Sequence, residues 1–177
     1  KATEVLTEAN RLAIGGNSDL MTAVDGLTSI VKGYGDAAGT ASEIADTMFT
    51  ASLAGKLSIE ELSSGIGKVI PLATTMSVSL EEITAAISSL TLGGISAKES
   101  ITGVRAILAS VAKPSSEAAR LAKEIGLEFN SAAIQANGFG KFLEEVKTKT
   151  KGSSDQMAIL FGGVESLVPA LALTGNA

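Results

Sequence analysis

The segment SVSLEEITAAISSLTLGGISAKES, residues 77–100, contains two signals that decide how this chain folds. Ser79 is followed three residues later by Glu82, and Ser96 is followed three residues later by Glu99. This spacing is typical of a capping box, in which the serine oxygen accepts a hydrogen bond from the third N–H of a helix and the glutamate accepts one from the serine N–H. The segment therefore predicts two helix starts, and the glycine pair between them predicts a helix end.

The same signal occurs at three other places in the chain: Thr40 with Glu43, Ser58 with Glu61, and Ser153 with Gln156. Two of the five helix starts, at Ser58 and Ser79, also have apolar residues placed to form a hydrophobic staple across the cap. These residues are Leu57 with Leu62 and Val78 with Ile83. We expect each cap to contribute about 1 kcal/mol to stability.

The apolar residues between the caps recur at helical spacing. Ile59, Leu62, Ile66 and Val69 step by three or four residues, which places them on one face of a helix, and no run alternates apolar and polar residues in the manner of a strand. We expect an all-α fold, a compact multi-helix domain of about ten short helices, with a C-terminal helical hairpin as one option. The expected helices are residues 2–14, 18–33, 41–54, 59–75, 80–92, 97–111, 115–125, 138–150, 154–162 and 164–174.

Glycine and proline mark the expected ends and bends of these helices. Left-handed glycines are expected to close helices at Gly15-Gly16, Gly55, Gly93-Gly94, Gly126 and Gly152. Pro71 lies inside the fourth expected helix, and the apolar face continues beyond it, so the pattern favours a kink over a break. Pro114 is expected in the first turn of the seventh helix, where its missing N–H costs nothing.

The least regular part of the sequence is residues 127–140, where we expect a loop or a short helix around Ala132. This segment divides the chain into a main helical body, residues 1–126, an irregular connector, residues 127–140, and a C-terminal helical segment, residues 141–177. One continuous domain is the alternative, since 177 residues are enough for a single core. Because the chain begins with Lys1 rather than Met, we expect it to be a segment of a longer protein.

The composition excludes several kinds of functional site. The chain has no Cys and no His, so disulfides, thiolate nucleophiles, Ser-His-Asp triads and zinc sites with Cys or His ligands are excluded. A net charge of −5 argues against nucleic-acid binding, and the basic run from Lys147 to Lys151 is expected at a helix C-terminus. The uncharged windows are too short to span a membrane. We expect the four methionines in the core: Met21, Met48, Met76 and Met157.

Adjacent carboxylates are the remaining candidates for chemistry, and they occur at Glu60-Glu61, Glu81-Glu82 and Glu144-Glu145. Glycosidases need two facing carboxylates about 5 to 9 Å apart, whereas neighbours on a helix point about 100° apart. We interpret the pairs as acids of first helical turns that the helix dipole stabilises. The glycine pairs around Tyr34 and Ile66 are interpreted as a helix end and a close approach of two helices, because they lack the spacing of a phosphate-binding loop. We therefore assign no catalytic, cofactor-binding or metal-ligating residue and expect no enzymatic activity.

A series of short motifs runs in order from Gly33 to Gly175. It comprises Tyr34-Gly35, Asp46-Thr47-Met48-Phe49, LSIEEL, Pro71-Leu72-Ala73, VSLEEI, LTLGGI, Thr102 with Arg105, Lys113-Pro114, Glu117-Ala118, EIGLEF, Leu160-Phe161-Gly162 and Ala172-Leu173-Thr174-Gly175. This ordered series resembles the phage tail tape measure proteins, specifically the core region of the lactococcal-phage (TP901) type.

The resemblance implies a structural component of a phage or prophage tail that acts in tail assembly and length determination. It implies tail tube subunits and tail assembly chaperones as partners, self-association as an option, and a location in the virion tail and, during assembly, in the host cytoplasm. No catalytic residues belong to this region of the family. Two alternatives stay open: a peptidoglycan-cleaving module of a tail protein, and a generic bacterial helical adaptor domain.

Overall fold

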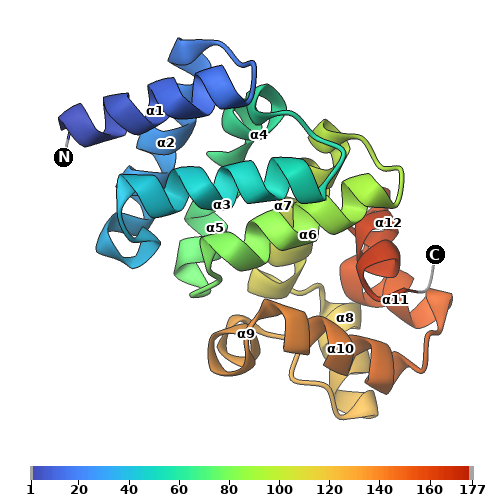
Figure 1. Ribbon diagram of the computed structural model, residues 1–177. Helices are drawn as coiled ribbons and strands as arrows, with labels where there is room; N and C mark the ends of the chain where they lie inside the picture. The colour runs from blue at the N-terminus through green and yellow to red at the C-terminus, as the bar shows by residue number, and fades with distance from the viewer. Residues whose placement is uncertain (1, 176–177) are drawn as a thin grey trace.

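The computed structural model describes residues 2–175, so Lys1 and residues 176–177 of the expected end segments lie outside it (Figure 1). Within residues 2–175 every regular element is a helix, which confirms the prediction of an all-α fold. The elements are α1 (Ala2–Gly15), α2 (Leu20–Tyr34), the 3₁₀-helix η1 (Gly35–Ala38), α3 (Ala41–Ala54), α4 (Ile59–Ile66), α5 (Ile70–Thr75), α6 (Leu80–Leu92), α7 (Ala97–Ala112), α8 (Ser116–Ile125), α9 (Ser131–Asn137), α10 (Phe139–Thr150), α11 (Ser154–Phe161) and α12 (Val164–Leu173).

The predicted helix starts are confirmed in detail. Both hydrogen bonds of the capping box are present at Thr40, Ser58, Ser79 and Ser96, which precede α3, α4, α6 and α7. At Ser153 only the serine half is present, since its hydroxyl accepts a hydrogen bond from the backbone N–H of Gln156 at 3.4 Å. Three further caps use residues that the sequence analysis did not identify as caps: Asp19, Ser115 and Asn130.

The single helix expected over residues 59–75 is wrong, because the chain breaks between α4 and α5. Lys68 and Val69 donate backbone hydrogen bonds over three residues to Gly65 and Ile66, which tightens the end of α4. A new helix then begins, and Pro71 lies in its first turn. A proline in that position removes no helical hydrogen bond, so the result is a break ahead of Pro71 and not a kink at it.

The left-handed glycines expected at three helix ends and the expected place of one proline need correction. After α1 neither Gly15 nor Gly16 has a positive φ, and the left-handed residue is Asn17, with φ of 48°. Gly126 closes α8 in the left-handed conformation, with φ of 66°, as expected. Gly55, however, closes α3 with an extended backbone, φ −101°, and α10 is closed by a left-handed Lys151 one residue before Gly152. Pro114 stands before the cap residue of α8 and not in its first turn. The short helix around Ala132 is present as α9, and it and the break at Pro71 account for two helices beyond the expected number.

Two layers of helices make up most of the molecule. The first layer consists of α1, α3, α6 and α10, which lie side by side and run in the same direction (Figure 1). Phe49 of α3 packs against Gly15 of α1, and the Ser88 hydroxyl of α6 donates a hydrogen bond to the Ala51 carbonyl of α3 at 2.9 Å. The backbone N–H of Phe139, at the start of α10, donates to Glu82 of α6 at 2.7 Å.

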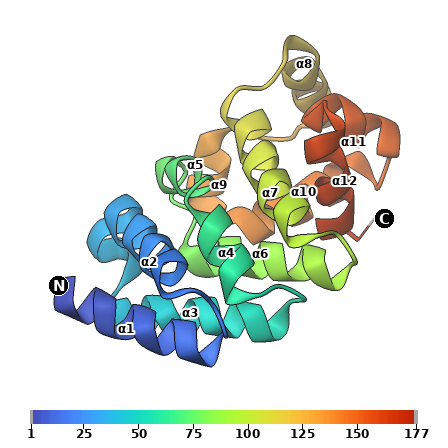
Figure 2. The same cartoon turned by 90° about the horizontal axis from the view of Figure 1, so that it is seen from above.

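The second layer consists of α2, α4 with α5, α7 and α12, and it covers one face of the first (Figure 2). Its helices approach closely at glycines. A Cβ atom built on Gly26 of α2 would lie 2.9 Å from the Cα of Ser63 in α4, and one on Gly65 of α4 would lie 2.5 Å from the Cδ1 of Ile101 in α7. One on Gly103 of α7 would lie 2.2 Å from the Cγ of Pro169 in α12. The close approach predicted at Gly65 is thus confirmed.

These layers contain an internal repeat that the sequence analysis did not find. Gly16, Gly55 and Gly94 are spaced by 39 residues, and each stands between a first-layer helix and the second-layer helix that follows it. Equivalent residues of consecutive units are therefore 39 residues apart in the sequence. Between units 2 and 3 the spacing falls to 38 for residues that follow Gly94, because the loop after Gly94 is one residue shorter than the first two loops. We call residues 2–39, 40–78 and 79–114 units 1, 2 and 3. A period of this length is typical of stacked helical repeats.

Equivalent residues in the three units have equivalent surroundings. Ala9, Met48 and Ile87 are related by 39 residues, and all three are fully buried in the first layer. The three close-approach glycines of the second layer are likewise equivalent: Gly26, Gly65 and Gly103. Each unit thus buries its apolar face against the next unit, as in stacked repeat proteins.

The core is continuous through all of the described helices. Its buried side chains come from each of α1 to α12 and form one cluster. Phe129, between α8 and α9, packs against Phe142 of α10 and Phe161 of α11, with ring centroids 5.8 Å and 5.4 Å apart. Three of the four methionines are buried as expected, whereas Met21 is exposed in the first turn of α2, which corrects that prediction.

Candidate functional site

The adjacent glutamates were the only candidates for catalysis, and the structure uses two of the three pairs as helix caps. Glu61 and Glu82 close the capping boxes of α4 and α6. The interpretation as first-turn acids is confirmed for these two pairs. It is wrong for Glu144 and Glu145, which lie in the interior of α10 because that helix begins at Phe139.

Glu60 and Glu82 also accept hydrogen bonds at the start of a helix other than their own. Glu60 of α4 accepts hydrogen bonds from the Ser18 hydroxyl and the Asp19 backbone N–H, both at 2.9 Å, at the start of α2. Glu82 accepts from Ser79 with one oxygen and from the backbone N–H of Phe139 with the other. Sequence spacing carries no signal for such contacts, because the partners are 41 and 57 residues apart. Glu60 therefore links unit 2 to unit 1, and Glu82 links unit 3 to α10.

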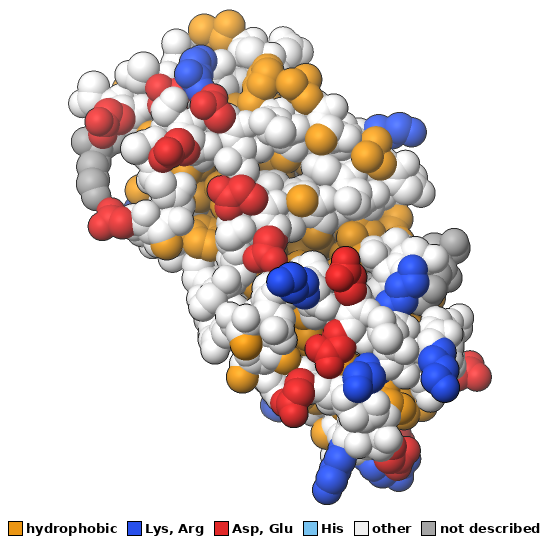
Figure 3. Space-filling view, turned by 60° about the horizontal axis from the view of Figure 1, so that its bottom comes forward, with side chains coloured by type: hydrophobic (Ala, Val, Ile, Leu, Met, Phe, Trp, Pro, Cys, Tyr) orange, Lys and Arg blue, Asp and Glu red, His pale blue; other side chains and the backbone are white. Residues whose placement is uncertain are grey.

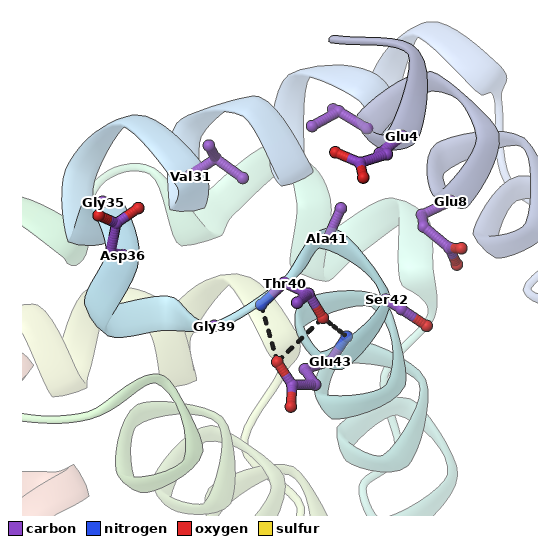
Figure 4. A pocket seen from close by; sticks show the side chains of 11 residues that line it. Glu4, Glu8, Val31, Gly35, Asp36, Gly39, Thr40, Ala41, Ser42 and Glu43 are labelled. Carbon is purple, nitrogen blue, oxygen red and sulfur yellow. Dashed lines mark hydrogen bonds between the residues drawn. The ribbon is translucent and has the colours of Figure 1, made fainter. Parts of the chain in front are cut away.

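An acidic surface pocket lies between α1, the end of α2 and the start of α3 (Figure 4). It has a volume of about 650 Å³, and four of its lining residues are acids: Glu4, Glu8, Asp36 and Glu43. Glu43 turns back to Thr40, with its carboxylate 2.8 Å from the Thr40 backbone nitrogen. Glu8 forms an ion pair with Arg11 at 3.1 Å.

The electrostatics of this pocket do not favour acid catalysis by Glu43. Hydrogen bonds from the backbone N–H and then the hydroxyl of Thr40 lower the pKa of Glu43. A carboxyl group with a lowered pKa is ionised at neutral pH and has no proton to give, whereas a general acid needs a raised pKa. Within residues 2–175 there is also no group of three or more acidic side chains placed to hold a metal ion.

The surface offers a different candidate site, a row of exposed apolar side chains at the ends of three first-layer helices. Ile14, Leu53 and Leu92 are equivalent residues of units 1, 2 and 3, and they are 75%, 75% and 56% exposed. We call these three residues the apolar row. Figure 3 shows hydrophobic side chains reaching the surface at several places on one face of the molecule, among polar and charged side chains. Exposed apolar residues scattered singly need no explanation, but the same exposed position in three consecutive units is a pattern expected of a contact surface.

The described part of the chain contains no helix with the length and apolarity required to cross a lipid bilayer.

Comparisons with known proteins agree with a scaffold. The family described as phage-related minor tail protein matches residues 1–162. The chain is also 25% identical over 145 residues to a tape measure protein of Pneumococcus phage Dp-1. That match covers 82% of this chain but 13% of the relative, so the chain spans a small part of the relative's length. No solved structure matches the chain. Since the family match extends over nearly all of its length, the chain belongs to the phage-related minor tail protein family.

Proposed function

We propose that this chain is a structural segment of a tape measure protein, which acts in the assembly and length determination of a phage or prophage tail. Its family and its similarity to the Dp-1 tape measure protein support this assignment. By the same resemblance its partners are tail tube subunits and tail assembly chaperones. The chain is then present in the host cytoplasm during assembly and in the virion tail afterwards.

The apolar row is the observation that carries the proposal. Its three residues repeat at the spacing of the units, so a partner that contacts one unit meets the same chemistry on the next two. A long or periodic partner, such as a tail component, benefits from such repetition because successive contacts act at a high effective concentration. An enzyme needs convergent polar groups in a pocket, whereas this row consists of exposed apolar side chains near the ends of three helices.

Replacing the apolar row tests the proposal directly. In the phage or prophage that encodes this chain, the triple change Ile14→Ser, Leu53→Ser and Leu92→Ser should abolish or strongly reduce assembled tails in electron micrographs. The purified triple variant should keep the melting temperature of the parent within a few degrees, because exposed side chains contribute little to the core. The matched control is Ile14→Leu, Leu53→Met and Leu92→Met, which keeps the row apolar and should assemble normally.

Three results would contradict the proposal. Normal tails from the serine variant would show that the row makes no contact required for assembly. Release of peptidoglycan fragments by the purified chain, lost on changing a single glutamate to glutamine, would favour the wall-cleaving alternative. A gene neighbourhood without tail tube or tail chaperone genes would favour the generic helical adaptor.

A further inference from the structure

The outer face of unit 1 exposes positions that units 2 and 3 bury. Leu6 of α1 is 54% exposed, whereas its equivalents Ala45 in α3 and Thr84 in α6 are 1% and 3% exposed. The larger and more apolar residue is therefore the one in contact with water. An apolar side chain of this size is expected inside when the fold allows it.

The second-layer helix of unit 1 shows the same difference. Leu20 of α2 is 39% exposed, whereas its equivalents Ile59 in α4 and Ala97 in α7 are 0% and 4% exposed. Val24 of α2 is half-buried, although the equivalent Ser63 and Ile101 are buried. Thus α1 and α2 both expose residues whose equivalents in units 2 and 3 are buried, and no described part of the chain covers them.

Units 2 and 3 show what covers these positions. Ile59 packs against Gly16 of unit 1, a glycine on which a Cβ atom would lie 2.2 Å from the isoleucine Cγ1. Ile101 packs in the same way against Gly65 of unit 2. In both cases the glycine belongs to the preceding unit. Gly16 lies between the two helices of unit 1, and Gly65 lies within α4 of unit 2. The equivalent contacts for Leu20 and Val24 require one more unit ahead of α1.

We propose that the outer face of unit 1, formed by Leu6, Leu20 and Val24, is a repeat interface that binds one further two-helix unit of the full-length polypeptide. The bound unit has uncharged helix faces and a small residue opposite Val24, where Ile101 meets Gly65 and Ser63 meets Gly26. This proposal rests on the internal repeat and does not depend on the function proposed above.

A second copy of the chain is a poor occupant for this face. Head-to-tail stacking of two copies would need a free close-approach glycine at the other end of the array. Gly103 holds that position in unit 3, and it is already covered by Pro169 of α12. The relative of known length extends far beyond the matched segment, which covers 13% of it, so the full-length polypeptide has room for another unit.

Single cysteines test the proposal without disturbing the core, because the chain has no cysteine of its own. Leu6→Cys is the probe, and Ile14→Cys on the same helix is the matched control, because position 14 is exposed in every unit. Both thiols should react rapidly with a maleimide in the 177-residue chain. In the full-length protein the reaction at position 6 should slow by about 10-fold or more, since a buried thiol reacts only through local opening, while position 14 should react as before. Site-resolved mass spectrometry measures both rates.

Two outcomes would overturn the proposal. If the maleimide rate at position 6, divided by the rate at position 14, were the same in the 177-residue chain and in the full-length protein, nothing would cover the face. Concentration-dependent protection of position 6 in the 177-residue chain, together with a dimer in analytical ultracentrifugation, would identify a second copy as the occupant. Neither outcome bears on the tail-assembly test, which changes the apolar row.

Discussion

Glu82 serves two helices with one carboxylate, because it closes the capping box of α6 and accepts the first N–H of α10. Glu61 is its matched control, since it occupies the same position in the box of α4. We expect Glu61→Ala to lower the free energy of unfolding by about 1 kcal/mol, the usual loss for a cap. Glu82→Ala should lower it by about 2–3 kcal/mol, because the N–H of Phe139 also loses its acceptor in a partly buried position.

Urea denaturation of the two variants measures this difference. Glu82→Gln should fall between Glu82→Ala and the parent, because its single amide oxygen can accept only one of the two sets of hydrogen bonds. Equal losses for Glu61→Ala and Glu82→Ala would mean that the contact with α10 adds nothing to stability.

Two capping glutamates also predict an acid dependence of stability. Hydrogen bonds from Thr40 lower the pKa of Glu43, and hydrogen bonds from Ser96, the hydroxyl first, lower the pKa of Glu99. A carboxyl whose pKa is lowered on folding stabilises the fold above its unfolded-state pKa, and it loses that contribution as the pH falls through its folded-state value. The double variant Glu43→Gln, Glu99→Gln should therefore differ less from the parent below a pH of about 4 than at pH 7. Melting curves across this range would contradict the prediction if the difference were constant.

At this scale the sequence predicted the local contacts and missed the distant ones. Ser58 with Glu61 is readable because a capping box fixes its spacing at three residues. The contacts of Glu60 with Ser18 and of Glu82 with Phe139 depend on how separate helices pack, and no spacing rule describes them. Glu144 was misread because adjacent carboxylates look alike wherever they stand in a helix.

Among the helices, the glycine contacts decide how closely the units stack. Gly103→Ala should lower the free energy of unfolding by about 1–3 kcal/mol, because the new methyl group would meet the rigid ring of Pro169. Gly140→Ala in α10 is the matched control, since a Cβ there meets no described atom within 4 Å. Alanine at position 140 should raise stability by about 0.4–1 kcal/mol through the unfolded state and helix propensity. Thermal melts that rank the two variants in the opposite order would contradict this account of the second layer.

The break before Pro71 shows why helix continuity was harder to predict than helix starts. The apolar series from Ile59 to Val69 continues across the break, because α4 and α5 both bury their apolar side against the same neighbours. Periodicity alone therefore could not separate one kinked helix from two. Two features identify the break. One is the place of Pro71 in the first turn of α5. The other is the pair of backbone hydrogen bonds that Lys68 and Val69 donate over three residues, which only the structure reveals.

For the whole molecule we predict one cooperative unfolding transition, which favours a single domain over the three-part division at residues 127–140. The reason is the continuous core, to which every described helix contributes.

Tyr34 is the only tyrosine, and its hydroxyl donates to the Val78 carbonyl at 3.0 Å, so its absorbance reports on the contact between units 1 and 2. Burial, followed by the charges of Glu81 and Glu82, raises the pKa of Tyr34, which keeps this donor protonated. Far-UV circular dichroism and tyrosine absorbance should give the same midpoint. A separate transition seen only by circular dichroism would support the division.

The repeat leads to a prediction about deletions. Removing residues 40–78 takes out one whole unit, so the face of unit 1 that contacts unit 2 meets the face of unit 3 that contacts unit 2. We expect this variant to be helical, monomeric and cooperative in unfolding. Removing only residues 59–78 is the control, because it deletes α4 and α5 and leaves the apolar side of α3 uncovered. We expect aggregation or loss of cooperativity from the smaller deletion, and the opposite order of stability would contradict the repeat.

The repeat is difficult to recognise in the sequence, although the helix caps follow it. The caps at Ser58 and Ser96 stand 38 residues apart at equivalent positions, but they were compared with the cap at Ser79, which belongs to the other layer. Between units the residues at equivalent positions also differ, as Ala9, Met48 and Ile87 do, because any apolar side chain of suitable size fills the core. The conserved quantity is burial, which becomes visible only in the structure.

The equal spacing of Gly16, Gly55 and Gly94 has a consequence for inheritance. The segments from Gly16 to Gly55 and from Gly55 to Gly94 have the same length, and unit 2 meets units 1 and 3 at equivalent glycines, Gly26 and Gly65. Unequal crossing-over between the coding segments of two such units inserts or removes the codons of one complete unit. The reading frame is then kept, and so are the two surfaces through which the units on either side are joined. We therefore expect related phages to differ here by whole units, in discrete steps, and to tolerate few insertions of other sizes.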